Sequence, residues 1–237
     1  MERLEYDSLA PAPPTRNDGR VAENGVKRRD AARTRAELLA EATAAFAAGG
    51  YTGTGVDEIA ERANTTKRMI YYYFGSKEQL YLSVLENAYR GIREAEQKLE
   101  VDGLAPVEAL RRLAVLTYDH HLAHEDFIRL VAIENIHRGR FIGQIESLRE
   151  LNAPALDLLD QLLERGREAG DFRTDVGALD VHLLISSYCV FQVANQHTFG
   201  HLFGTDLQDP DRRPHLRAII GDVVVAWLTR GVDTAAR

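Results

Sequence analysis

The feature that most constrains this 237-residue chain is a helical period that runs almost without interruption from residue 31 onward. Apolar residues recur at spacings of three, four and seven, which place them on one face of an α-helix. No segment alternates apolar and polar residues over a length useful for a β-strand. The pattern predicts an all-α fold of about nine or ten helices.

Glycine, proline and threonine residues mark the ends of the predicted helices. The first helix begins near Ala31 and stops at Gly49-Gly50, and two short helices follow over 56–63 and 66–74. Ser76 is placed to cap a long helix over 77–99. The remaining helices are predicted over 106–123, 125–137, 140–150, 154–169, 177–199 and 213–231, with Pro154 as one of the breaks.

Composition and charge divide the chain into three regions. Residues 1–26 contain prolines and glycines with almost no periodic apolar residues, so we expect a disordered tail. Residues 27–76 are predicted to form a small head domain, and residues 77–237 a larger body. The net charge is −7 overall, but nine Lys and Arg against six Asp and Glu make residues 27–77 mildly basic. A basic head on an acidic body favours a polyanionic partner for the head alone.

Several function classes are disfavoured by what the sequence lacks. The one cysteine, Cys189, excludes a disulfide framework and a cysteine-based zinc site, and its apolar surroundings predict a buried, inert thiol. There is no apolar run near the ~18 residues that span a bilayer and no signal-peptide core, so we expect a cytoplasmic protein. Phosphate-binding glycine loops, nucleophile elbows and His-Glu-x-x-His motifs are also missing. We therefore expect neither an enzyme nor a cofactor.

The segment from Val56 to Phe74 predicts a helix-turn-helix, whose second helix lies in the major groove of DNA. Its turn, Ala63-Asn64-Thr65, requires a residue near the left-handed conformation, which asparagine tolerates better than most residues. Thr66 begins the second helix, where its hydroxyl can cap the helix or meet a phosphate.

The second helix of this motif carries side chains suited to DNA. Lys67 and Arg68 lie in its first turn, and arginine pairs in bidentate fashion with guanine; a solvated surface is the alternative for both. Three tyrosines follow, for which core packing is the alternative, but three successive residues cannot all face one side at about 100° per residue. The predicted contacts are Thr66, Lys67, Arg68, Tyr71, Tyr72 and Tyr73.

Basic residues also precede the first helix. Arg28 and Arg29 follow Lys27 and can lie along phosphates or enter a minor groove. A charged tail without DNA contact is an equal alternative.

A long ordered set of residues surrounds the motif at fixed spacing. It comprises Thr34-Arg35, Leu38-Leu39, Ala45-Phe46, Gly50-Tyr51, Thr54, Val56, Ile59-Ala60, Ala63, Thr66, Ile70-Tyr71, Tyr73-Phe74 and Lys77-Glu78-Gln79-Leu80. With this set, residues 30–85 resemble the DNA-binding head of the tetracycline-repressor (TetR) family of bacterial regulators. The resemblance implies a dimeric repressor with a three-helix head and a larger helical body that binds a ligand and dimerises.

The resemblance adds one contact and shows three departures. It adds Thr54 to the DNA-binding residues and includes Lys77, which opens the next helix and can also hold the DNA backbone from the far side. Asn64 stands where the family has a turn glycine, Thr65 where it has a valine, and Arg68 where it has a small residue or proline. Arg68 adds a long donor and leaves the operator sequence open.

The resemblance also implies that a ligand in the body moves the long helix that links body and head. Candidate ligand contacts are polar or aromatic residues within apolar helical stretches. The spacing of the histidines also fits a metal site, but no carboxylate-rich second half accompanies them, so a pocket or structural role is favoured. Residues 127–141 are similar to relatives that control the catabolism of small organic or aromatic acids. The candidates are His120, His124, Phe127, Glu134, Asn135, Tyr188, Gln192, Asn195 and Gln196.

The last two long helices, over 177–199 and 213–231, are predicted to form the dimer face, and the second carries a wide apolar stripe. A four-helix bundle formed from two subunits would bury this face. Packing within the subunit's own core is the alternative. The function we expect is a repressor released from a palindromic double-stranded DNA operator by a small organic molecule. The alternatives are an activator or a ligand-independent regulator and, more distantly, an enzyme or a protein-interaction adaptor. The predicted dimer residues are Ile220, Val224, Trp227 and Leu228.

Overall fold

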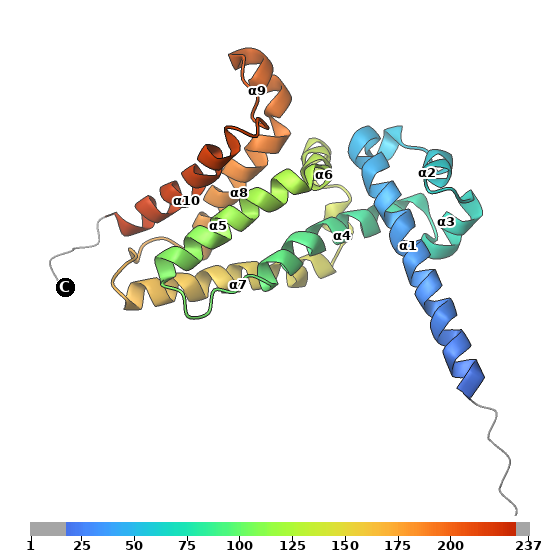
Figure 1. Ribbon diagram of the computed structural model, residues 1–237. Helices are drawn as coiled ribbons and strands as arrows, with labels where there is room; N and C mark the ends of the chain where they lie inside the picture. Colours follow the sequence, from blue (N-terminus) through green and yellow to red (C-terminus); the bar gives the residue numbers. More distant parts are fainter. Residues whose placement is uncertain (1–17, 231–237) are drawn as a thin grey trace, which may run out of the picture.

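The computed structural model describes residues 18–230, and all regular structure in this range is helical, which confirms the predicted all-α class (Figure 1). Three helices form the head: α1 (Asp18–Gly53), α2 (Val56–Arg62) and α3 (Lys67–Phe74). The body contains α4 (Lys77–Gln97), α5 (Pro106–Ala123), α6 (Glu125–Ile136), a 3-10 turn (Ile142–Gln144), α7 (Ser147–Glu168), α8 (Ala178–Ala194), α9 (Gln196–Phe203) and α10 (Arg213–Thr229).

Both ends of α1 differ from the prediction. The backbone is helical from Asp18, so residues 18–26 belong to a helix and not to the predicted disordered tail. Residues 1–17 of that tail lie outside the described residues. At the other end, Gly50 has φ 67° and ψ 179°, a conformation that glycine adopts at little cost. The predicted stop at Gly49-Gly50 is therefore a kink, after which the helix resumes.

The segment around Pro154 is one continuous helix, where we predict helices over 140–150 and 154–169. A short 3-10 turn comes first, and α7 then passes through Pro154 without a break. Proline removes one backbone donor, but the apolar side of α7 is buried in the body and holds the helix in place. That side carries Leu148, Ala155, Leu159, Leu162 and Leu163.

The predicted helix over 177–199 is two helices. It divides at Asn195, whose φ of −107° and ψ of 4° end α8 and start α9. In Figure 1, α9 projects away from the layer formed by α8 and α10.

One apolar core holds the three head helices together. Phe46 of α1, Ile59 of α2, and Ile70 and Phe74 of α3 are buried in it. Asn64 has φ 47°, which confirms the left-handed residue predicted for the turn between α2 and α3. The core thus fixes the angle at which α3 is presented.

Helix α4 leads from the head into the body. The Ser76 hydroxyl accepts a hydrogen bond from the amide of Gln79 at 3.1 Å, which confirms the predicted N-cap. The head core extends along the first turns of α4 and takes in Leu130 and Phe141 of the body. Head and body are therefore joined by shared apolar packing as well as by the chain.

A buried carboxylate lies at this joint. Glu134 of α6 accepts hydrogen bonds from the Tyr81 hydroxyl of α4 at 3.0 Å and from the Phe141 and Ile142 amides at 3.1 and 3.0 Å. The Tyr51 ring of the head packs against Phe141 in a tilted arrangement, with ring centroids 4.4 Å apart and an interplanar angle of 44°. Three donors and a cluster of aromatic rings thus tie α1, α4 and α6 together.

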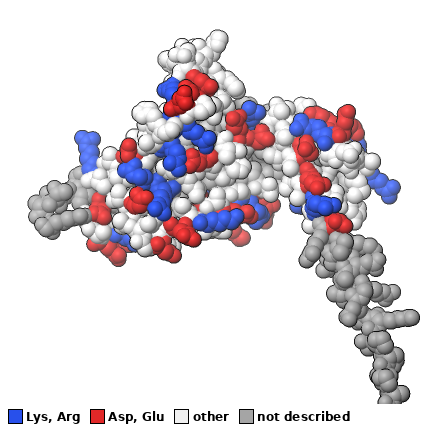
Figure 2. All heavy atoms as spheres, viewed as in Figure 1, with Lys and Arg blue, Asp and Glu red and all other residues white. Residues whose placement is uncertain are grey.

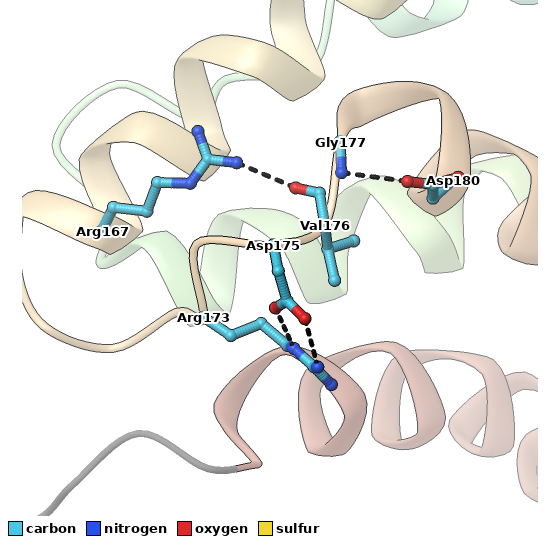
Figure 3. A network of polar contacts seen from close by, with 6 residues as sticks. All are labelled: Arg167, Arg173, Asp175, Val176, Gly177 and Asp180. Carbon is cyan, nitrogen blue, oxygen red and sulfur yellow. Dashed lines mark hydrogen bonds and ion pairs between the residues drawn. The ribbon is translucent and has the colours of Figure 1, made fainter.

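The body packs α5 against α7, α8 and α10 around a second apolar core. Polar contacts hold the connection between α7 and α8 (Figure 3). The Arg167 guanidinium donates to the Val176 carbonyl at 2.8 Å, and Arg173 forms a bidentate ion pair with Asp175. No helix in the described range has the length and apolar character needed to cross a membrane.

Replacing Tyr81 with phenylalanine removes the hydroxyl and keeps the ring. Glu134 then loses one of its three donors in a buried site, so we expect the free energy of unfolding to fall by about 1.5–3 kcal/mol. Urea unfolding followed by circular dichroism measures this change. Tyr72→Phe alters an exposed ring and serves as the control, with a change of no more than about 0.5 kcal/mol. Equal stability of the two variants would contradict the role of the Tyr81–Glu134 bond.

Candidate nucleic-acid interface and effector pocket

Helix α3 presents aromatic and basic side chains to the outside. Lys67, Arg68 and Tyr71 are exposed, and Tyr72 is 77% exposed. Tyr73 is half-buried and packs beside the head core. The three tyrosines therefore divide between the outer face and the core side, as the helical period requires.

The two basic residues in the first turn of α3 have different surroundings. Lys67 Nζ lies 3.0 Å from Asp57 Oδ2 of α2, and this partner raises the pKa of Lys67. Arg68 has no hydrogen-bond or ion-pair partner in the described part of the chain. Arg68 is therefore the first-turn cation that is free to take an acceptor from outside.

The N-terminus of α3 is open. Thr66 occupies the N-cap position, but its exposed hydroxyl makes no capping hydrogen bond. The positive end of the helix dipole favours an anion at such a site. This position suits the phosphate contact that we predict for Thr66.

Two other predicted contacts are placed differently. Thr54 is 2% exposed, and its hydroxyl donates to the Ala45 carbonyl at 3.0 Å. The hydroxyl therefore has a partner within the head, and the DNA contact through Thr54 stays a prediction that this placement does not support. Lys77 is half-buried, with its ammonium group 4.6 Å from the centroid of the Tyr51 ring. A phosphate contact from Lys77 requires the ammonium group to share or leave this ring.

The basic residues ahead of the head are not part of the described surface. The side chains of Arg28 and Arg29 lie outside the described residues, so their predicted contacts stay predictions. On the face drawn in Figure 2, basic and acidic side chains are interspersed over head and body. On that face, charge alone does not single out a DNA-binding surface.

A cavity of about 610 Å³ lies where the head meets the body. It is lined by three predicted ligand residues, His120, His124 and Phe127, and by Thr43 of α1. Asn87, Ala88 and Gly91 of α4 line another part of the cavity. The imidazoles of His120 and His124 stack with centroids 4.0 Å apart. The structure thus brings together three of the nine predicted ligand residues in one cavity.

Glu134 and Asn135 do not line this cavity, contrary to the prediction. The Glu134 carboxylate is buried at the joint between head and body, as described above. Asn135 is exposed, and its side-chain amide donates to the Val131 carbonyl at 2.8 Å. The side of α6 that carries Glu134 packs against the head, which its apolar period alone does not reveal.

The predicted residues of α8 and α9 also lie outside the lining. The Tyr188 hydroxyl donates to a backbone carbonyl of α10 at 2.8 Å, which pins α8 to α10. Gln192 is buried, and its Oε1 has no hydrogen-bond partner. Asn195 forms the turn before α9. Gln196 Nε2 lies 3.4 Å from Oε2 of Glu125, a residue that lines the cavity.

A polar group in the interior of the body is missing from the sequence predictions. Arg93 and Glu96, each 7% exposed, form an ion pair at 2.7 Å on the inner side of α4. His120 and His121 of α5 and His182 of α8 lie close enough for the charge of Arg93 to lower their pKa values. A signal was available, because Arg93 and Glu96 continue the buried face of α4 at helical spacing.

Burial keeps these histidines neutral. Burial, then the neighbouring His124 and Arg93, lower the pKa of His120 to about 4. Burial, then His120 and Arg93, lower the pKa of His121 to about 3. Both imidazoles are therefore uncharged at neutral pH.

Two further expectations concern metal and thiol chemistry. Among the described residues, no group of three or more His, Cys, Asp or Glu side chains is arranged to hold a metal ion. Burial raises the pKa of the Cys189 thiol to about 12, so the thiol stays protonated, as expected for an inert buried cysteine.

The predicted dimer residues are mostly internal. Ile220, Val224 and Leu228 are buried in the body's own core, where α10 packs on α5. Because their apolar side is already covered within the protomer, their placement does not support the predicted contact with a second subunit. Trp227 is half-buried at the edge of the same core.

Other apolar residues of α8 and α10 are exposed. Leu179 and Leu183 of α8 are each 66% exposed, and Val223 of α10 is 45% exposed. A helix pair that is apolar on both sides has a second face left to cover.

The depressed histidine pKa values predict loss of stability in acid. An unfolded histidine has a pKa near 6.5, so between that value and the folded values of about 4 and 3 the unfolded state binds more protons. Stability from neutral His120 and His121 is complete above about pH 6.5 and is lost as the pH falls toward those values. The loss reaches about 1.4 kcal/mol per pH unit for each histidine. Glu96 acts in the opposite direction, because burial raises its pKa.

Urea unfolding at pH 7.5 and pH 5.5 measures this loss. In a His121→Gln variant we expect a smaller difference between the two pH values than in the wild type. The same difference in both proteins would show that His121 does not titrate as described.

Comparison with known protein families gives two matches. Residues 38–84 match the family described as bacterial regulatory proteins, tetR family. Residues 106–224 match the tetracyclin repressor-like C-terminal domain. Together they cover the helix-turn-helix and most of the body.

Individual relatives agree with these matches. The chain is 36% identical over 208 residues to the HTH-type transcriptional repressor NicS of Pseudomonas putida, across 88% of this chain and 98% of that protein. It is 32% identical over 212 residues to the HTH-type transcriptional regulator RutR of Escherichia coli K12, across 86% of each. The crystal structure of the transcriptional regulator SCO4942 of Streptomyces coelicolor has a TM-score of 0.63 at 28% identity, across 83% of this chain and 99% of that chain. The chain therefore belongs to the TetR family of DNA-binding transcriptional regulators and is not an enzyme.

Proposed function

We propose that the protein is a repressor that binds its operator as a dimer and is released by a small organic molecule bound in the body. The observation that carries this proposal is the position of the cavity of about 610 Å³. Thr43 of the head lines one side of it, and Asn87, Ala88 and Gly91 of α4 line another. A ligand there touches the head and the body at once.

The DNA-binding half of the proposal rests on α3. Its first turn enters the major groove, where Arg68 reads a base edge and the open N-terminus at Thr66 meets a phosphate. Tyr71 and Tyr72 supply hydroxyls to the backbone. Lys67 contacts the DNA from its position beside Asp57 of α2.

Release follows from the spacing of the two heads. In a dimer, the two α3 helices must meet major grooves one helical turn apart, about 34–36 Å. A ligand that fits the body better when α4 has shifted favours a different spacing and lowers operator affinity. The loss of operator affinity is then set by how much more tightly the ligand binds one arrangement than the other.

The effector we propose for this cavity is a small organic molecule. Regulators of this family typically bind small-molecule effectors and dimerise. The relative NicS, 36% identical, is described as a repressor, which supports repression as the direction of control.

The proposal is tested by fluorescence anisotropy on DNA from upstream of the protein's own gene, with random duplex as competitor and over a series of salt concentrations. Specific binding that weakens with salt supports an operator-binding regulator. A reporter gene behind the same DNA then separates repression from activation. Binding to neither duplex at low salt would contradict the proposal.

Replacing Arg68 with alanine tests its role on a base. If Arg68 reads a base, the loss is about 1–3 kcal/mol on the operator and much smaller on random DNA. The same anisotropy titrations on both duplexes measure the difference. Arg90→Ala, which removes an exposed arginine from α4, is the matched control. An equal loss on both duplexes would assign Arg68 to the phosphate backbone instead.

The dimer face we propose consists of Leu179 and Leu183 of α8 and Val223 of α10, joined by the half-buried Trp227. These side chains lie on the two helices from which we expect a four-helix bundle. Leu179, Leu183 and Val223 are exposed on the protomer, whereas Trp227 also packs against the edge of its core. Burying them against a second copy removes apolar surface from water.

Leu183→Glu places a charge in this face without touching the core. We expect a monomer by sedimentation velocity and a loss of operator affinity, because two linked heads are needed for tight binding. Leu202→Glu alters an equally exposed leucine on α9 and is the control. A Leu183→Glu dimer of wild-type stability would rule out this face.

A further inference from the structure

The cavity that contains the predicted ligand residues is poorly suited to an acid. Besides His120 and His124 it is lined by Glu125 and Asp126, and no arginine or lysine lines it. Burial keeps His120 neutral, as described above. An anionic ligand would meet carboxylates there without a compensating cation.

A second cavity has the opposite chemistry. It measures about 190 Å³ and lies between α4 and α7, with Arg93 and Glu96 on one side. The rest of its lining is largely apolar and includes Leu99, Ala155 and Leu158. Drug-sized ligands occupy about 300–1,000 Å³, so this cavity admits a smaller molecule.

The guanidinium of Arg93 has unused donors. Nη1 lies 2.7 Å from Glu96 Oε2, but the two atoms lack hydrogen-bond geometry, and Nε has no partner at all. Arginine stays charged in proteins, so these donors cannot be relieved by deprotonation. A buried donor without an acceptor is costly, and such groups call for an explanation in a native protein.

The side chains around Arg93 do not supply the missing acceptor. His120 and His182 are neutral imidazoles near it, and His120 Nδ1 also lacks a partner. Glu96 is the one carboxylate in contact with Arg93 among the described residues. A planar carboxylate from outside offers two acceptors in the geometry that a guanidinium prefers.

We propose that the cavity between α4 and α7 binds a small monocarboxylic acid, with its carboxylate on Arg93 and its apolar part against Leu99, Ala155 and Leu158. Glu96 competes with the ligand for Arg93 and gives up its place when the acid binds. Arg93 lies on α4, the helix that continues into the head. Binding of the acid therefore acts on the same helix whose shift is proposed to release the operator. The effect on DNA rests on the proposed function, whereas the binding itself does not.

The binding is tested without DNA, by isothermal titration calorimetry and thermal unfolding of the full-length protein. The probes are benzoate, phenylacetate and hexanoate, each beside its uncharged primary amide. We expect at least one acid to bind saturably and raise the unfolding midpoint, while its amide binds at least about tenfold more weakly. If no acid binds more tightly than its amide, the proposal is wrong.

Two variants locate the carboxylate. Glu96→Gln removes the competing charge and keeps Arg93, so we expect the acid to bind more tightly than it binds the wild type. The double variant Arg93→Gln/Glu96→Gln removes the pair without leaving a lone buried charge, and we expect a loss of about tenfold or more. Arg90→Gln, an exposed arginine on the same helix, is the control and leaves binding unchanged.

Other outcomes overturn the site. Weaker binding in Glu96→Gln, or unchanged binding in the double variant, would show that Arg93 does not hold the carboxylate. Loss of binding in His124→Ala, with the double variant unaffected, would place the acid in the larger cavity.

The same acid is then added to the complex of the protein with its operator. If the acid binds through Arg93 but leaves the complex intact, the binding site is supported, but it is not the site that triggers release. If the protein binds the acid but no operator DNA, the proposed function is wrong, whereas the acid-binding site is still supported by the calorimetry.

Discussion

The buried carboxylate of Glu134 is the interaction on which the relation of head to body depends. An ionised carboxylate away from water is tolerated when hydrogen bonds satisfy its oxygens, and here three donors do so from two directions. The Tyr81 hydroxyl comes from α4, and the amides of Phe141 and Ile142 come from the turn after α6. Burial and the neighbouring carboxylate raise the pKa of the Tyr81 phenol, so its proton stays available for the bond. Moving the head relative to α6 would break hydrogen bonds of a buried carboxylate, which costs free energy.

Helix α4 connects the Tyr81–Glu134 hydrogen bond to other sites in the body. Its first turns, including Tyr81, belong to the head core, and Ala88 and Gly91 further along the helix border the larger cavity. Arg93 and Glu96 follow on its inner face. One rigid helix therefore carries the head packing, the joint and two cavities in succession. A rigid element shared by several sites is the physical requirement for coupling between them.

The parts of the structure that sequence predicted well are those set by near neighbours in the chain. The turn at Asn64, the cap at Ser76 and the exposed first turn of α3 each depend on a few adjacent residues. The helical period also located most helices. It failed at Pro154, where packing of the surrounding apolar residues holds a helix that local preference would break.

The differences between prediction and structure share one cause, which is that periodicity shows a face to be buried without showing what buries it. The stripe of Ile220, Val224 and Leu228 was assigned to a second subunit, but α5 covers it. Thr54 matched a DNA-binding position, yet its hydroxyl serves the head itself. Both outcomes depend on partners far away or on the opposite side of a helix, and a single sequence carries no record of either.

Glu134 and Arg93 show how the structure separates two kinds of buried charge that look alike in sequence. Each is an ionisable residue inside an apolar helical face, and both are more than nine-tenths buried. The oxygens of Glu134 find a hydroxyl and two backbone amides, so the group is complete and holds the joint together. Arg93 has one ion-pair partner, unused donors and an adjoining cavity. A complete buried group is sufficiently explained by structure, whereas an incomplete one beside empty space has a position left for a ligand.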